Sequence, residues 1–180
     1  MCSCGTASIF LKLAFLVSGL ALLFHGIGYT TNSWRASKVN GAVVGEEGLW
    51  KRCEYLISHA CLSNEYTGSH RNADEIRSVR AFATISFIML IAVTVAIFVS
   101  LCIEFFRKKL FIFLEMGTAI AAGVLIILAV IIYGSTIIPA NPPSAASWSL
   151  ALSIVGAALA FATAVLVAVG GCGKAPTEAK

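Results

Sequence analysis

The sequence predicts a mainly α-helical membrane protein, in which a four-helix transmembrane bundle carries a small, disulfide-stapled antiparallel β-sheet on its extracellular side. Hydrophobic residues make up 58% of the 180 residues, the mean hydropathy is +0.88 and only 12% are charged, which is too apolar for a soluble domain of this length. Four stretches are long enough to cross a bilayer. A polar segment between the first two contains a close pair of cysteines.

The four expected spans follow from the length of helix that crosses the hydrocarbon layer. About 20 mainly apolar residues cover roughly 30 Å, and the stretches that qualify are residues 9–29, 81–105, 110–133 and 148–169. The other residues form a long loop (30–80), a tight turn (106–109), a short loop (134–147) and two tails, so residues 1–180 are expected to be one domain. The first stretch lacks a basic segment before it and is too long for a cleavable signal peptide, so we interpret it as a retained helix.

The expected orientation rests on two signals that conflict. Arg107, Lys108 and Lys109 make the tight turn basic, whereas the short loop has no charge, so the positive-inside rule places the turn in the cytoplasm. The long loop is also rich in bases, and counting them alone would place it inside as well. The cysteine pair decides, because a disulfide forms only in an oxidising compartment. We therefore expect the long loop outside the cell and both termini in the cytoplasm.

The long loop has the pattern of several short strands. Residues 29–34 are rich in Thr and aromatic side chains, residues 39–44 are β-branched around the hairpin signal Asn40-Gly41, and residues 49–57 surround Cys53. Residues 72–80 are expected to form a short helix that runs into the second span, with Asn72 as its N-cap. A small antiparallel sheet on the outer ends of the helices is the expected result.

The cysteine pair of this loop is Cys53 and Cys61. The seven residues between them suit a small hairpin closed by a disulfide. Such a bridge would stabilise the sheet by about 2.5 kcal/mol through loop entropy, and so small a sheet is marginal without it. A metal site is the alternative, but it would need two further ligands, and His59 and His70 give no familiar zinc spacing. We therefore expect a disulfide and no metal.

Four further residues of the long loop stand out: Trp34, Gly48, Leu49 and Trp50. Trp34, Leu49 and Trp50 have two interpretations. They could form an exposed recognition surface, or they could be structural and pack the edge of the sheet onto the bilayer and the helix ends. The structural role is favoured, because amphipathic aromatic rings concentrate at membrane interfaces.

The other cysteines are expected at or near the cytoplasmic face of the membrane; they are Cys2, Cys4, Cys102 and Cys172. This placement permits S-palmitoylation, and free thiols in a reducing cytosol are an equal alternative. Two carboxylates, Glu104 and Glu115, flank the basic turn, and we expect them to pair with its bases at the membrane interface.

Polar and small residues within the spans have simple interpretations. His25, near the end of the first span, is expected to reach toward the lipid headgroups. Gly156 and Ala160 lie four positions apart, a spacing that lets helix backbones approach closely in lipid. Packing within one bundle is favoured over contact between protomers. No charge falls in the middle of a span, which argues against a proton relay or solute carrier.

Motifs of an enzyme are absent from the sequence. It contains no nucleotide-binding loop, no zinc-binding helix motif and no serine elbow, so we expect neither catalysis nor a cofactor. The near-neutral long loop gives no basic surface for nucleic acid. We expect no small-molecule substrate.

Trp34, Gly48-Leu49-Trp50, Cys53 and Cys61, followed by Arg80 at the start of the second span, resemble the signature of the claudin superfamily. That superfamily includes peripheral myelin protein, the epithelial membrane proteins and stargazin-type auxiliary subunits. The resemblance covers nearly the whole chain and is closest to the epithelial membrane protein and claudin-like branches. It implies that the Gly-Leu-Trp residues dip toward the outer leaflet and anchor the sheet.

The resemblance implies a function in cell–cell contact or junction organisation at the plasma membrane, through the sheet and through lateral association with itself or another membrane protein. The alternative is an auxiliary subunit of an ion channel or receptor. The chain ends in Lys180, which departs from the Tyr-Val ending by which most claudins bind cytoplasmic scaffolds. Its second loop is also short for a tight-junction claudin, so barrier formation is not assumed.

Overall fold

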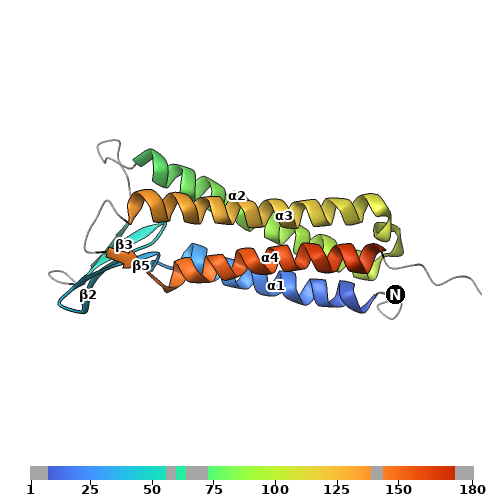
Figure 1. The fold of residues 1–180 in the computed structure, drawn as a ribbon, viewed down its shortest axis with the longest axis horizontal. Coiled ribbons are helices and arrows are strands. Elements are labelled where there is room, and N and C mark those ends of the chain that lie inside the picture. The colour runs from blue at the N-terminus through green and yellow to red at the C-terminus, as the bar shows by residue number, and fades with distance from the viewer. Residues whose placement is uncertain (1–7, 56–59, 64–72, 139–143, 173–180) are drawn as a thin grey trace, which may run out of the picture.

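A computed structural model of the chain describes residues 8–55, 60–63, 73–138 and 144–172. Four helices lie side by side and a small sheet covers one end of them (Figure 1). The helices are α1 (Ile9–Thr30), α2 (Ala73–Cys102), α3 (Lys109–Ile132) and α4 (Trp148–Cys172). All four are long and apolar enough to cross a membrane. The predicted fold class is confirmed.

The ends of the helices follow from local sequence. The Ser8 side chain caps α1 by accepting a hydrogen bond from the Phe10 amide. Asp74 and Glu75 lie in the first turn of α2, where the helix dipole favours acids. The short helix expected before the second span is therefore the first part of one continuous helix; Asn72, its expected N-cap, lies outside the described residues.

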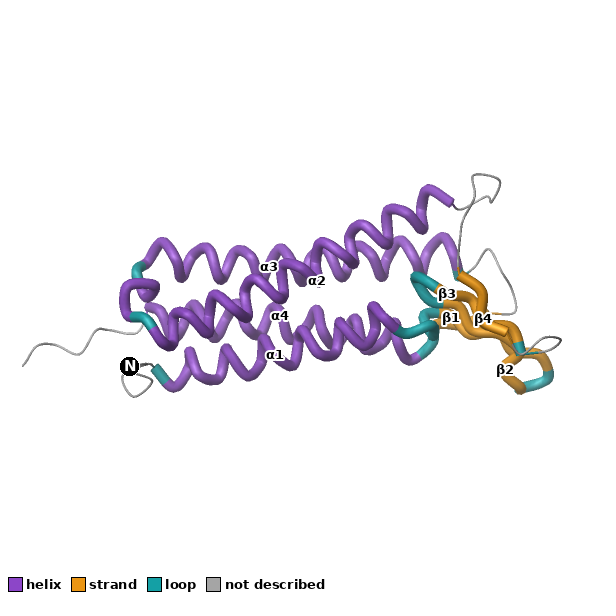
Figure 2. The backbone as a smooth tube through the Cα atoms, turned by 180° about the vertical axis from the view of Figure 1, so that it is seen from behind, coloured by secondary structure: helices purple, strands orange, loops and turns teal. Residues whose placement is uncertain are grey.

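Two irregular turns complete the helical part. A 3-10 turn, η1 (Glu104–Arg107), connects α2 to α3, and a π-helical turn, η2 (Tyr133–Ile137), continues α3 toward the sheet. The Arg107 guanidinium caps the end of α2, because its Nε and Nη2 donate to the carbonyls of Ser100 and Leu101 at 3.0 and 3.1 Å. We call the end of the bundle with η1 the turn end, and the opposite end the sheet end (Figure 2).

The bundle packs through small residues, as expected for helices in lipid. Ala119, Ala122, Ala157 and Ala160 are fully buried in its core. A Cβ atom at Gly156 of α4 would lie 2.9 Å from the His25 Cβ and 3.0 Å from the His25 backbone nitrogen of α1, so only glycine permits this approach. In the structure Gly156 and Ala160 therefore pack within one bundle.

The sheet has five antiparallel strands in the order β4-β3-β2-β1-β5. They are β1 (Arg35–Val39), β2 (Ala42–Glu47), β3 (Lys51–Glu54), β4 (Ala60–Ser63) and β5 (Ser144–Ala146). The turn between β1 and β2 is at Asn40-Gly41, as expected, and both residues have positive φ, 50° and 83°, as a type I′ hairpin turn requires.

Two features of the sheet differ from expectation. The strand predicted at residues 29–34 is wrong, because α1 continues to Thr30 and Tyr29 packs in the bundle, where its hydroxyl hydrogen-bonds to that of Thr84 at 3.0 Å. β5, which comes from the second loop, was not predicted. It pairs Arg35 with Ala146 and Ala36 with Ala145 and so connects the two loops.

Candidate functional site

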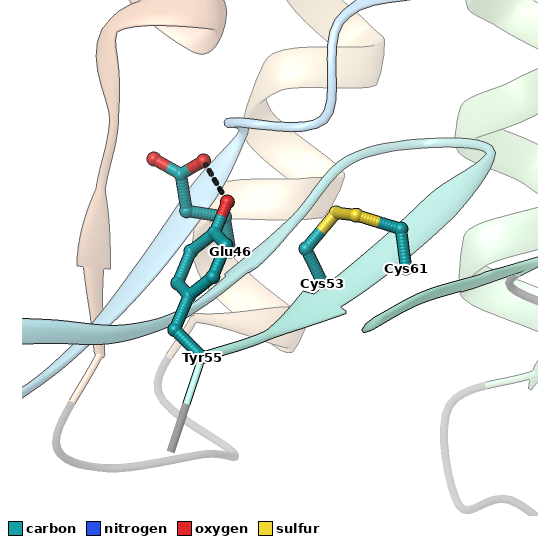
Figure 3. Close-up of a disulfide and its surroundings, with 4 residues drawn as sticks. All are labelled: Glu46, Cys53, Tyr55 and Cys61. Atoms are coloured by element: carbon teal, nitrogen blue, oxygen red, sulfur yellow. Dashed lines mark hydrogen bonds between the residues drawn. A yellow bond between two sulfur atoms is a disulfide. The ribbon is translucent and has the colours of Figure 1, made fainter. Parts of the chain in front are cut away.

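The disulfide connects the two strands at one edge of the sheet (Figure 3). Cys53 of β3 and Cys61 of β4 are directly opposite each other in the register, and their sulfur atoms are bonded. Nearby, the Tyr55 hydroxyl donates to the Glu46 carboxylate at 3.1 Å. Desolvation, this hydrogen bond and the carboxylate charge all raise the pKa of Tyr55. The bridge thus fixes β4 to the rest of the sheet.

Trp34 connects the sheet to three helices. Its ring is fully buried, and its indole Nε1 donates to the Gly28 carbonyl of α1 at 2.6 Å. The ring meets the Tyr133 ring edge-on, with centroids 5.1 Å apart, and its backbone carbonyl accepts from the Ser147 amide just before α4. A side chain with so many fixed partners is structural, which agrees with the favoured interpretation.

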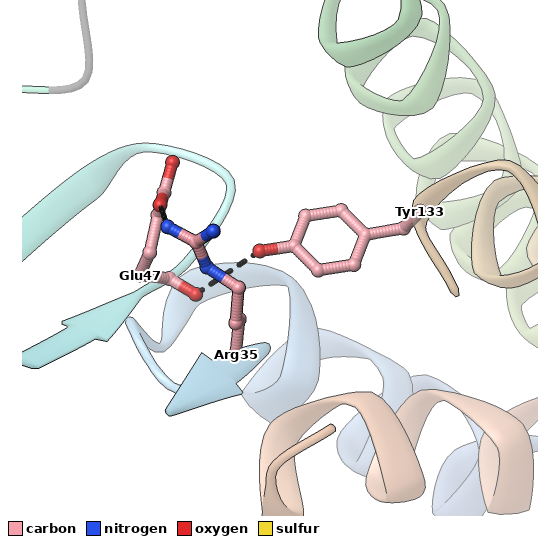
Figure 4. A network of polar contacts seen from close by, with 3 residues as sticks. All are labelled: Arg35, Glu47 and Tyr133. Atoms are coloured by element: carbon pink, nitrogen blue, oxygen red, sulfur yellow. Dashed lines mark hydrogen bonds and ion pairs between the residues drawn. The ribbon is translucent and has the colours of Figure 1, made fainter. Parts of the chain in front are cut away.

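A buried ion pair joins the first two strands of the sheet (Figure 4). Arg35 of β1 and Glu47 of β2 are cross-strand partners, their side chains are 5% and 7% exposed, and the Arg35 Nη2 donates to the Glu47 carboxylate. The Tyr133 hydroxyl donates to the Glu47 backbone carbonyl at 3.3 Å. The pair is therefore shielded from water where the sheet meets Tyr133 of η2.

This pair was missed in the sequence, although a signal for it exists. A regular hairpin about Asn40-Gly41 would place Arg35 opposite Glu46, because paired positions are then symmetric about the turn. A bulge between Ser37 and Lys38 shifts the register by one residue and brings Glu47 opposite Arg35 instead. The hairpin turn alone therefore predicts a pair between Arg35 and Glu46. The bulge, which the sequence does not indicate, replaces Glu46 with the buried Glu47.

The Gly48-Leu49-Trp50 segment makes the turn between β2 and β3. A Cβ atom on Gly48 would lie 2.5 Å from the Thr31 carbonyl oxygen and 2.6 Å from the Asn32 Cα, so only glycine fits. Leu49 is fully buried among Trp34, Ile76 and other apolar side chains. The motif thus holds the loop against the end of α1.

Trp50 and Arg80 complete this junction on its outer side. The Trp50 indole donates to the Tyr29 carbonyl at 3.0 Å, and the Arg80 guanidinium lies 5.3 Å from the centroid of its ring. The Arg80 Nε also donates to the Leu49 carbonyl at 2.7 Å. Through these two contacts Arg80 joins α2 to the Gly-Leu-Trp turn.

The structure places the predicted residues in separate regions. Trp34, Gly48, Leu49, Trp50 and Arg80 meet at the junction of sheet and bundle, which we call the sheet base, together with Arg35, Glu47 and Tyr133. Cys102 is half-buried at the turn end. Cys2, Cys4 and the side chain of Cys172 lie outside what the structure describes, so lipidation at these cysteines stays a prediction.

Two polar residues of the spans differ from expectation. His25 does not reach toward the headgroups: it is fully buried, and its Nε2 lies 3.3 Å from the Ala83 carbonyl oxygen and 3.1 Å from the Ser86 hydroxyl. Glu115 does not pair with the basic turn: it is buried and accepts a hydrogen bond from Ser100 at 2.5 Å. Each of them therefore has partners on α2, at His25 Nε2 and at Glu115 Oε1, as is usual for polar groups inside a membrane.

One exposed part of the sheet is the turn of the β1–β2 hairpin, which we call the tip and define as residues 38–43; the edge strand β4 is exposed as well, with Leu62 72% exposed. It lies away from the helices at the far end of the molecule (Figure 2). Val39 and Val43 flank the turn and are 46% and 42% exposed. Among the described residues, none covers these two valines, so the tip offers an exposed apolar surface.

The comparison with known families agrees with this architecture. Residues 7–170 match the PMP-22/EMP/MP20/Claudin family, which is nearly the whole chain. No curated protein sequence matches the chain significantly. The match spans α1 to α3, the entire sheet and α4 up to residue 170. The chain therefore belongs to the PMP-22/EMP/MP20/Claudin family, as a membrane protein with four transmembrane helices and an extracellular sheet.

Proposed function

We propose that the protein organises cell–cell contacts at the plasma membrane, and that it acts by association and not by catalysis. The partner on the neighbouring cell is a second copy of this chain or another membrane protein. The observation that carries the proposal is the contrast within the sheet: a base fixed to the helices, and an apolar tip that projects away from them.

The proposal requires the sheet end to face the outside of the cell. The Cys53–Cys61 disulfide supports this orientation, because such bonds persist in oxidising compartments. Arg107, Lys108 and Lys109 lie at the opposite end, where the positive-inside rule favours the cytoplasm. α1 begins and α4 ends at that turn end, so both termini are cytoplasmic in this orientation (Figure 1). An epitope after Lys180 should then be reached by antibody only in permeabilised cells.

The tip is suited to contact between membranes. Its turn residues, Asn40 and Gly41, lie in a tight hairpin, so Val39 and Val43 are presented on a pre-organised backbone that loses little entropy on binding. Exposed apolar side chains grouped at one projecting point mark interaction surfaces in soluble parts of proteins. A matching tip on a facing cell could cover them.

Mosaic cultures test this proposal. Cells that lack junctions of their own would express the fluorescently tagged chain in half of the population, and enrichment of the tag would be measured at each class of contact. We expect enrichment where two expressing cells meet, relative to the contact-free surface of the same cells. Uniform surface fluorescence, combined with stoichiometric co-purification with a pore-forming subunit, would contradict the proposal and favour the auxiliary-subunit function.

A further inference from the structure

The turn between α2 and α3 places a group of bases at the edge of the membrane. Arg107, Lys108 and Lys109 are consecutive, and Glu104 is the one acid among residues 103–109, so three bases against one acid leave this segment with a net charge of +2. Both helices that the turn connects are long and apolar enough to span the membrane. The charges therefore lie where the hydrocarbon layer ends, at the end of the bundle opposite the sheet (Figure 1).

The three bases have different environments. Arg107 is half-buried, and its guanidinium points back to the end of α2, where it donates to two carbonyls. Lys108 and Lys109 are exposed, and the Lys108 Nζ lies 3.9 Å from the centroid of the Phe105 ring. Among the described residues, neither lysine forms an ion pair with a carboxylate. Arg107 thus holds the turn, and two ammonium groups without a counter-charge remain on its surface.

Large apolar side chains are exposed beside the two ammonium groups. Phe105 precedes them and is 57% exposed, and Leu110 follows them and is 67% exposed. At a membrane boundary such side chains contact the lipid tails, while lysine side chains extend to the headgroups. A soluble acidic partner would leave the apolar side chains uncovered, and a zwitterionic lipid would leave the ammonium charges without compensation. A phospholipid with a net negative charge meets both requirements.

We propose that Lys108 and Lys109 bind the headgroup of an anionic phospholipid, whose acyl chains contact Phe105 and Leu110. Lysine offers a compact charge and no planar pair of donors, so the site selects the charge of the headgroup more than its shape. Each base close to a membrane surface strengthens the attraction to anionic lipid about fivefold. In the orientation proposed for the protein this lipid belongs to the cytoplasmic leaflet, which carries the anionic lipids. The binding does not depend on the proposed cell-contact function.

Native mass spectrometry of the full-length chain, released from lipid nanodiscs, tests this proposal. The nanodiscs contain equal amounts of phosphatidylserine and phosphatidylcholine with the same acyl chains, and the measured quantity is the ratio of the two lipids that stay bound. Both faces of a nanodisc have the same composition, so the result does not depend on the orientation of the protein in a cell. We expect phosphatidylserine to be enriched by at least about tenfold, and the enrichment to fall as salt screens the exposed charges.

Variants of the turn locate the site. Lys108→Gln with Lys109→Gln should lower the enrichment about tenfold, because both positive charges are lost. Lys108→Arg with Lys109→Arg keeps the charges and should retain the enrichment. Lys108→Gln alone should lower it about fivefold, whereas Lys38→Gln, the same substitution at the exposed tip far from the turn, should leave it unchanged. Both lysines of the turn are exposed, so these variants should fold, and the salt dependence of the unaltered chain decides in any case.

Four results would overturn the proposal. The first is equal retention of the two lipids by the unaltered chain, and the second is an enrichment that high salt leaves unchanged. The third is the same enrichment in the Lys108→Gln, Lys109→Gln variant as in the unaltered chain. The fourth is loss of the enrichment when soluble glycerophosphoserine is added in an amount equal to the phosphatidylserine, since the turn would then recognise a free phosphate and not a lipid.

Discussion

The base and the tip of the sheet belong to one structure but are built from different kinds of residue. At the base, Trp34 and Leu49 are fully buried, and the Arg35–Glu47 pair is shielded by Tyr133. At the tip, the two valines beside the hairpin turn are almost half exposed. The signature residues therefore hold the sheet to the helices, and the residues that we propose meet a partner lie outside the signature.

The comparison also shows why the base tolerates little change. Trp34 contacts α1 and η2, and Arg80 joins α2 to the Gly-Leu-Trp turn, so one substitution at either residue removes contacts between the sheet and the helices. At the tip a substitution changes only the surface of one hairpin. Variants of the base should therefore fail in folding, and variants of the tip should fail in binding alone.

The largest effect is expected from Trp34→Ala. Loss of this buried ring and of its hydrogen bond to Gly28 should lower the free energy of unfolding by about 3–5 kcal/mol. Thermal unfolding in detergent would measure the change. Trp148→Ala is the matched control, since this tryptophan is 51% exposed and its loss should cost less than about 1 kcal/mol. Equal losses of stability in the two variants would contradict the claim that the base is more important for stability than the exposed surface.

Glu47→Gln should have the next largest effect. It leaves the buried Arg35 without its counter-charge, which costs about 3 kcal/mol. Glu46→Gln on the same strand is the control, because its amide oxygen can still accept from Tyr55. The double variant Arg35→Met with Glu47→Leu should recover much of the loss, because apolar side chains can replace a buried pair. If the double variant is less stable than Glu47→Gln, the ion pair itself contributes to the free energy of unfolding, and apolar side chains cannot replace it.

Cys53→Ser should lower the stability by about 2.5 kcal/mol, because the unfolded chain gains the entropy of the open loop. Surface biotinylation is the measurement, and we expect the variant to be retained in the secretory pathway. Cys61→Ser should behave identically. Cys102→Ser, at the turn end, should reach the surface normally. Normal delivery of both disulfide variants would contradict a structural role for the bridge.

The smallest effect on stability is expected at the tip. Val39→Thr with Val43→Thr keeps the β-branched shape that suits a strand and should change the free energy of unfolding by less than about 0.5 kcal/mol. Asn40 and Gly41 are unchanged, so the hairpin turn is retained. A large loss of stability would show that the tip, like the base, is needed to hold the sheet together.

Much of this fold could be predicted because the signals are local. Long apolar stretches mark the helices, and Asn40-Gly41 marks the hairpin that forms the tip. Where a local signal was misread, the environment explains it. The Thr-rich and aromatic residues 29–34 were predicted as a strand, but Tyr29 stacks on Phe87 of α2, with ring centroids 5.3 Å apart, and so extends α1.

The remaining features depend on contacts between distant residues. β5 pairs with β1 across more than a hundred positions, and no local pattern indicates it. The partners of His25 and Glu115 lie on α2, so their burial follows from how the helices rotate against each other. The sequence indicated five residues of the base, Trp34, Gly48, Leu49, Trp50 and Arg80, but not Tyr133, and the buried ion pair there depends on the bulged register.

The central claim, that the base holds the sheet while the tip makes the contact, is tested most directly in the mosaic cultures. Surface delivery and enrichment at contacts would be measured in the same cells for the Val39→Thr, Val43→Thr variant and for the unaltered chain. We predict equal surface delivery and a loss of enrichment where two expressing cells meet. Enrichment equal to that of the unaltered chain would contradict the claim and would place the contact surface elsewhere on the protein.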